Sequence, residues 1–166
     1  MVRPARIIEI GTGGGGFSYY LRDTLAVLQL RNCRILSYSL EELPAFETLR
    51  SSGIEVVIQD VMGKEASRDL GATIGDLGLT LLLCDGGNKI EEFRRFSASL
   101  KKGDYIMVHD FAPTADYFRD FIKNHTWNWL EITSDDVSDE IRLQELVPKH
   151  GNLFTGISWG CFQKQL

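Results

Sequence analysis

Residues 6–17 read RIIEIGTGGGGF, and this stretch decides the fold. Its apolar part, Arg6–Gly11, predicts a short strand that leads directly into a glycine cluster. The apolar-periodic segment Phe17–Leu28 that follows predicts a helix. Glycine suits such a turn because it adopts positive φ and lets a ligand approach the backbone. Since the first N–H groups of the helix are unpaired, the stretch predicts a nucleotide-type cofactor site.

Two cofactor classes compete for this turn. Gly11, Gly13 and Gly16 spell G-x-G-x-x-G, which is the fingerprint of dinucleotide binding. Glu9 argues against that class, because an acidic residue at the end of the first strand would repel a pyrophosphate. The same carboxylate suits S-adenosylmethionine, which carries a sulfonium and an ammonium group and no phosphate.

With Glu9 included, the stretch resembles the first motif of the class I S-adenosylmethionine-dependent methyltransferases, E/D-x-G-x-G-x-G. Glu9, Gly11, Gly13 and Gly15 fill this motif in full. The resemblance implies a methyltransferase whose cofactor contacts lie in this loop and at the ends of the following strands. The candidate cofactor-binding residues are Glu9, Gly11, Thr12, Gly13, Gly15, Phe17, Ser39, Asp60, Val61 and Asp85.

Size and composition indicate one globular domain over residues 1–166, with 43% hydrophobic and 25% charged residues. The 18 basic and 23 acidic residues give a net charge of −5, which argues against a nucleic-acid partner. Cys33, Cys84 and Cys161 lack metal-ligand spacing and are expected to be buried in a reducing compartment. No apolar run is long enough to span a membrane and no signal peptide is evident, so we expect a cytoplasmic protein without a membrane partner.

Strand-like and helical segments alternate along the chain, which predicts an α/β fold. We expect a Rossmann-like, doubly wound, mostly parallel sheet of about seven strands, with helices on both faces and an antiparallel last strand. The predicted strands are Arg6–Gly11, Arg34–Ser39, Glu55–Asp60, Thr80–Asp85, Tyr105–Asp110, Trp129–Thr133 and Leu153–Gln163. The predicted helices are Phe17–Leu28, Glu41–Ser51, Lys64–Leu70, Ile90–Leu100 and Ala115–Asn124, and the run from Asp135 to Glu140 is expected to be an acidic loop.

The ends of the second and third strands carry the rest of the predicted cofactor site, because ligands collect beyond the carboxyl ends of parallel strands. Methyltransferases usually end the second strand with an acidic residue that binds the ribose hydroxyls, but here Ser39 stands at that point. Either Glu41 or Glu42 could replace it, or both could be acidic residues of the next helix. Asp60 and Val61 suit the adenine ring, although Asp60 could equally be a helix cap.

Asp85 and the pair His109-Asp110 follow two central strands and should converge in space. Two carboxylates with a third ligand suit a hard cation such as Mg²⁺. The pattern also resembles the metal-assisted small-molecule O-methyltransferases of the cephalosporin-hydroxylase and macrolide-sugar type. That resemblance implies Asp85, His109 and Asp110 as metal ligands, S-adenosylmethionine and a candidate Mg²⁺ as cofactors, and Asp85 and His109 as catalytic residues.

Asn88 departs from that branch, which often has a histidine base three residues after the first aspartate. His109 or Lys89 could take its place, the metal alone could acidify the hydroxyl, or the substrate could differ. We therefore expect O-methylation of a small hydroxylated molecule or sugar. The alternatives are a lapsed, regulatory S-adenosylmethionine-binding protein and an NAD-type oxidoreductase. Because no substrate-covering helices precede the first strand, a homo-oligomer is one way to cover the cleft.

Overall fold

The computed structural model describes residues 3–151 and 157–165, and its centre is a seven-stranded sheet in the order β3-β2-β1-β4-β5-β9-β8. Strands β3, β2, β1, β4 and β5 are parallel, and β9 is antiparallel to both of its neighbours. This confirms the predicted sheet and its antiparallel last strand. The strands are β1 (Arg6–Ile10), β2 (Arg34–Ser39), β3 (Glu55–Ile58), β4 (Thr80–Cys84), β5 (Tyr105–His109), β8 (Leu146–Pro148) and β9 (Trp159–Lys164).

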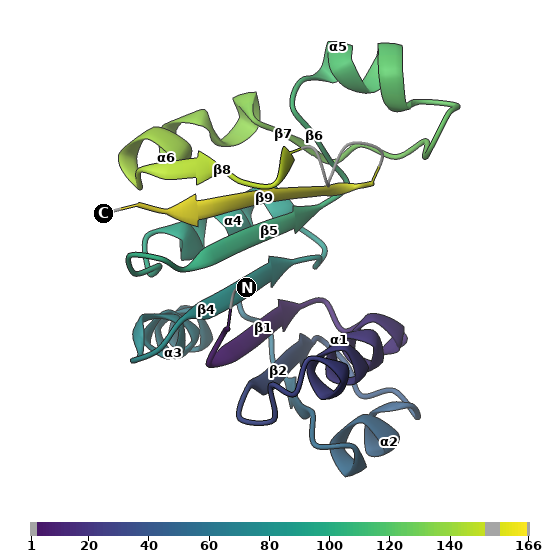
Figure 1. Ribbon diagram of the computed structural model, residues 1–166, viewed down its shortest axis with the longest axis vertical. Coiled ribbons are helices and arrows are strands. Elements are labelled where there is room, and N and C mark those ends of the chain that lie inside the picture. The colour runs from purple at the N-terminus through teal and green to yellow at the C-terminus, as the bar shows by residue number, and fades with distance from the viewer. Residues whose placement is uncertain (1–2, 152–156, 166) are drawn as a thin grey trace.

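Helices cover both faces of the sheet, as Figure 1 shows. Alternate residues of β1 point to opposite faces. Ile7 joins the core beneath α1 (Gly16–Val27) and α2 (Phe46–Ser51). Ile8 joins the core beneath α3 (Lys64–Gly75) and α4 (Lys89–Ser97). None of the helices in the described residues combines the length and the apolar character needed to cross a membrane.

The face that carries α1 and α2 is only partly covered over β5. Ile106 and Val108, which point to the α4 side, are fully buried. Tyr105, Met107 and His109, which alternate with them, stay partly exposed. A second subunit, which the sequence analysis gave as one way to cover the cleft, would have a partly open sheet face to contact, and this stays a prediction.

The segment between β5 and β8 differs from the sequence prediction. Trp129–Thr133 was expected to be a strand of the main sheet, but only Ile132–Thr133 (β7) is extended, and it pairs with Phe111–Ala112 (β6) in a separate two-stranded sheet. The main sheet instead gains Leu146–Pro148 (β8), which lies at its edge. Two of the three β8 residues are exposed, so this strand carries almost no hydrophobic pattern.

Several helices also differ from the prediction. The expected helix Glu41–Ser51 begins only at Phe46, because Pro44 disfavours helical geometry in the residue before it. Ala115–Asn124 divides into α5 (Ala115–Tyr117) and a π-helical turn, η1 (Phe118–Ile122).

The expected acidic loop contains a 3₁₀ turn, η2 (Asp135–Val137), and the helix α6 (Ser138–Leu143). The last strand was predicted as Leu153–Gln163; β9 begins at Trp159, and positions 153–156 of that prediction lie outside the described residues.

Candidate functional site

The glycine loop after β1 uses left-handed backbone at three positions. Gly11, Gly13 and Gly15 have φ values of 98°, 50° and 80°, whereas Gly14 and Gly16 do not have positive φ. Because glycine is the residue that adopts this geometry readily, the backbone requires the 11-13-15 spacing of the methyltransferase motif. In the dinucleotide fingerprint the last glycine would be Gly16. The backbone of Gly16 does not have positive φ, so its conformation does not require glycine. Gly15 also caps α1, so the N-terminus of the helix adjoins the loop.

Glu9 lies beneath this loop and is almost fully buried, with 1% of its surface exposed. The hydroxyls of Ser18 and Ser37 both donate to its carboxylate, and Ser37 also contacts the Thr12 hydroxyl at 2.8 Å. Burial raises the pKa of Glu9, and the two serine hydrogen bonds oppose that rise. The carboxylate therefore fixes β1, β2 and α1 together at the floor of the loop.

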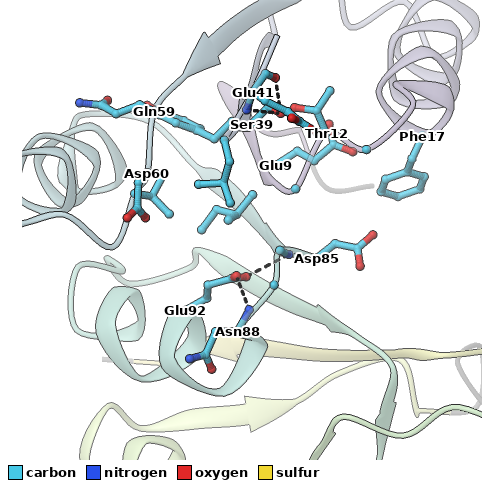
Figure 2. A pocket seen from close by; sticks show the side chains of 18 of the residues that line it. Glu9, Thr12, Phe17, Ser39, Glu41, Gln59, Asp60, Asp85, Asn88 and Glu92 are labelled. Carbon is cyan, nitrogen blue, oxygen red and sulfur yellow. Dashed lines mark hydrogen bonds between the residues drawn. The ribbon is translucent and has the colours of Figure 1, made fainter. Parts of the chain in front are cut away.

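A cavity of about 680 Å³ opens above the loop, between the ends of β1, β2, β3 and β4 (Figure 2). Figure 2 shows side chains from all four strand ends around it, with Asp60 and Phe17 at opposite sides. Among the described residues that line the cavity, none is lysine, arginine or histidine, whereas five are acidic: Glu9, Glu41, Asp60, Asp85 and Glu92. The lining is therefore suited to a cationic ligand rather than to a phosphate.

The end of β2 brings a free carboxylate to the cavity. The Ser39 hydroxyl donates to the backbone carbonyl of Glu41 at 2.9 Å, so Ser39 is engaged with its own turn. Glu42 forms a two-point ion pair with Arg50 and does not line the cavity. Glu41 lines the cavity, and its carboxylate has no partner among the described residues. Of the two acids that the sequence offered in place of Ser39, Glu41 is the one that reaches the site.

The end of β3 supplies the other predicted contacts on this side. Asp60 Oδ1 accepts a hydrogen bond from the backbone N–H of Met62 at 2.9 Å, which shapes the turn before α3. Asp60 does not cap α3, because the N-cap residue is Gly63. Val61 and Met62 also line the cavity, and Val61 is buried.

The loop after β4 is held by Glu92, a residue that the sequence analysis did not single out. Glu92 is buried in α4 and accepts hydrogen bonds from the backbone N–H groups of Gly86 and Asn88, both at 3.2 Å. The Asn88 side chain accepts a hydrogen bond from the backbone N–H of Glu91 and caps α4. Asn88 thus has a structural role at the start of α4.

Asp85, His109 and Asp110 come together as predicted. Nδ1 of His109 lies 3.1 Å from Oδ1 of Asp85 and 3.3 Å from Oδ2 of Asp110. The other ring nitrogen, Nε2, forms a 2.7 Å hydrogen bond with the hydroxyl of Ser158. The hydrogen bond to Asp85 and the two nearby carboxylates raise the pKa of His109, although burial opposes them.

Lys89 and Glu131 belong to the same cluster. Lys89 begins α4, and its Nζ lies 3.7 Å from Asp85 Oδ1, 3.4 Å from Asp110 Oδ2 and 2.7 Å from Glu131 Oε2. Burial alone would lower the pKa of Lys89, but the hydrogen bond to Glu131 and the other carboxylates outweigh it and raise the pKa. The sequence named Lys89 only as a substitute base. It gave no signal for Glu131, which lay inside a predicted strand.

An aromatic row connects the cofactor cavity with this cluster. The ring of Phe17, which lines the cavity, stacks on Trp159 with 5.4 Å between centroids. The Trp159 ring lies 4.8 Å from the His109 ring. The two halves of the candidate site are therefore adjacent, and Asp85 belongs to both.

No protein-family model and no curated protein matches this sequence. Solved structures do match. A form of CmcI described with Mg and SAM has a TM-score of 0.66 and 15% identity, and the match covers 99% of this chain and 66% of that one. MycE methyltransferase of the mycinamycin biosynthetic pathway, in complex with Mg and SAH, has a TM-score of 0.59 and 14% identity, with 98% and 45% covered.

An O-methyltransferase family protein from Burkholderia thailandensis has a TM-score of 0.56 and 14% identity, with 98% of this chain and 52% of that chain covered. This chain therefore has the α/β fold of S-adenosylmethionine-dependent methyltransferases, which confirms the resemblance at the level of the fold. It spans less than two thirds of the length of these structures, 66% at most.

Proposed function

We propose that the protein is an S-adenosylmethionine-dependent methyltransferase that methylates a hydroxyl group of a small molecule. The observation that carries this proposal is the charge of the cavity, which five carboxyl side chains and no basic side chain line among the described residues. S-adenosylmethionine bears two cationic groups, whereas NAD bears two phosphates that these carboxylates would repel. The backbone also supports the proposal, because positive φ at Gly11, Gly13 and Gly15 follows the methyltransferase spacing.

In this proposal the cofactor side of the site is divided among the strand ends. Glu41, the free carboxylate after β2, accepts hydrogen bonds from the ribose hydroxyls in place of the acidic residue that Ser39 replaces. Asp60 and Val61 contact the adenine ring. The glycine loop approaches the methionine part of the cofactor, over the buried carboxylate of Glu9.

The acceptor side of the site is formed by Asp85 and His109. Asp85 orients the His109 ring through Nδ1, and Nε2 already holds a hydroxyl group, that of Ser158, at 2.7 Å. A substrate hydroxyl bound in the same way could give its proton to Nε2 while its oxygen attacks. The bound cofactor would supply a methyl group on a cationic sulfur, and the protein's contribution is to hold the two reactants in line.

A lapsed, S-adenosylmethionine-binding protein is the second candidate. It is favoured by the pairing within the acidic cluster, which comprises Asp85, Lys89, His109, Asp110 and Glu131. In this cluster both ring nitrogens of His109 already have partners, and Lys89 contacts three carboxylates. Such a protein would bind the cofactor and transfer nothing. Divalent-metal assistance stays a prediction from the resemblance, and neither candidate depends on it.

The test is a calorimetric titration of the protein with S-adenosylmethionine, S-adenosylhomocysteine and NAD. Micromolar binding of the first two with no heat from NAD is the expected result. Binding of NAD alone, or of none of the three, would overturn the proposal. Turnover of a panel of hydroxylated acceptors, followed by release of S-adenosylhomocysteine, then separates the enzyme from the lapsed binding protein. A protein that binds the cofactor and turns over no acceptor would favour the second candidate.

A further inference from the structure

The acidic cluster contains a cation of the protein itself, the ammonium group of Lys89. The fold neighbours CmcI and MycE are described with Mg, and Asp85, His109 and Asp110 offer ligand atoms that all lie within 4.8 Å of one another. The two carboxylate oxygens of this group, Asp85 Oδ1 and Asp110 Oδ2, each face two nitrogens already. Both lie within 3.7 Å of Lys89 Nζ and within 3.3 Å of His109 Nδ1.

The lysine is built into the cluster. Its side chain is only 6% exposed, and its ammonium also contacts Glu131 Oε2 at 2.7 Å and the backbone carbonyl of Gly86 at 3.2 Å. The ammonium has three N–H donors, and three carboxylates and one carbonyl surround it. Because burial of a charged group is costly unless the group is paired, these contacts stabilise the Lys89 ammonium in its position within the cluster.

The donor set does not fit a resident Mg²⁺ while Lys89 is in place. Mg²⁺ needs oxygen ligands at about 2.1 Å and in near-octahedral order. An ion bound to Asp85 Oδ1 and Asp110 Oδ2 would lie beside the ammonium that contacts the same two oxygens, and the two cations would repel each other. His109 supplies a nitrogen where this ion prefers oxygen.

We infer that Lys89 is the resident cation of this cluster and occupies the place that a divalent metal would otherwise take. The cluster has three carboxylates, Asp85, Asp110 and Glu131, and the ammonium neutralises one of the three charges. Without the ammonium, the oxygens of Asp85 and Asp110, beside His109, would be free to bind a divalent cation such as Mn²⁺. This inference goes beyond the proposed function, because its test requires neither cofactor binding nor turnover.

The experiment compares metal binding by the wild type, Lys89→Met and a control, Lys101→Met. Methionine keeps the length of the lysine and removes its charge. Lys101 is the matched control because it also pairs with a buried carboxylate, Asp104 at 2.8 Å, but before β5 rather than after it. Mn²⁺ binding is followed by the loss of the electron paramagnetic resonance signal of the free ion, and Mg²⁺ binding by calorimetry.

We expect Lys89→Met to bind one Mn²⁺ at least about tenfold more tightly than the wild type and Lys101→Met do, because a like charge has been removed from the site. Equal affinity of all three proteins would overturn the inference, whether that affinity is high or absent. Lys89→Gln is the second variant in case Lys89→Met does not fold. The wild type itself gives an independent readout: Mn²⁺ should leave the ring signals of His109 sharp in nuclear magnetic resonance spectra. Selective broadening of those signals at stoichiometric Mn²⁺ would place a metal in the cluster and also overturn the inference.

Discussion

Gly11 lies directly against the backbone of Asp85, so closely that an added Cβ atom would be 2.2 Å from the Asp85 carbonyl oxygen. The two residues follow neighbouring parallel strands, and the Asp85 N–H donates to the carbonyl of Ile10 at 2.9 Å. This contact joins the glycine loop to the loop that carries the acceptor-side aspartate. The cofactor half and the acceptor half of the candidate site are therefore fixed relative to each other by backbone rather than by side chains.

Gly11→Ala is expected to destabilise the protein by roughly 3 kcal/mol or more, because it combines a steric clash with a left-handed φ of 98°. Gly14→Ala is the control, since its φ is not positive and nothing lies within 4 Å of an added Cβ. That variant should stay within about 0.5 kcal/mol of the wild type. Urea unfolding measures both. Similar stability of the two variants would show that the loop does not depend on this close approach.

Glu41→Gln is expected to weaken S-adenosylmethionine binding by about tenfold, which is the scale of one hydrogen bond to a charged group. The reason is that Glu41 is the acidic residue after β2 that lines the cavity. Glu42→Gln is the matched control, because the neighbouring acid is paired with Arg50 away from the cavity. Calorimetry with each variant measures the difference. Equal affinities for the cofactor would exclude Glu41 as the ribose-binding residue.

Much of this fold could be predicted because it depends on local pattern. β1 and β4 are mostly apolar and almost fully buried on both faces, and β5 is mostly apolar and fully buried on its α4 side, so their position and their parallel pairing follow from sequence. Leu146–Pro148 could not be found in this way, because an edge strand of three residues with two exposed ones has no pattern to detect. Trp129–Thr133 has the pattern of a strand, but Trp129 is 66% exposed. Only the last two residues of this segment, Ile132 and Thr133, pair with another strand, β6.

The sequence could predict those residues of the candidate site that lie at or directly after the end of a strand. Asp85, His109 and Asp110 meet because β4 and β5 are neighbours, and the rule that parallel strand ends form sites covers them. The ion pair of Lys89 and Glu131 joins residues 42 positions apart, and Glu131 comes from a segment that does not belong to the main sheet. The identity of the cation in the cluster depends on this pair, which is why the sequence alone pointed to a metal.

His109 should give the protein a pH-dependent stability. Its pKa in the folded protein is raised above the ordinary 6.5, first by the hydrogen bond to Asp85. The protonated ring therefore contributes stability that is fully present below pH 6.5 and is lost as the pH rises through the folded-state pKa. The difference in free energy of unfolding between the wild type and His109→Gln should be largest at the acidic end of this window and shrink above it. Urea unfolding at several pH values checks this, with the exposed His125→Gln as the control. A difference that stays constant with pH would contradict the pairing.

Glu9→Gln is expected to change stability and cofactor binding in opposite directions. Burial raises the pKa of Glu9, so the charged form costs stability as the pH rises through the folded-state pKa, and a neutral glutamine should be about 1 kcal/mol more stable at pH 7. The same change removes a negative charge below the glycine loop and should weaken S-adenosylmethionine binding by about tenfold. Urea unfolding and calorimetry measure the two effects, and Glu91→Gln, a half-exposed residue of α4 that does not line the cavity, should change neither. If Glu9→Gln lost both stability and affinity, the carboxylate would be a structural anchor through Ser18 and Ser37 alone. If Glu9→Gln instead gained stability and lost affinity, the negative charge of Glu9 would favour ligand binding while it destabilises the folded protein.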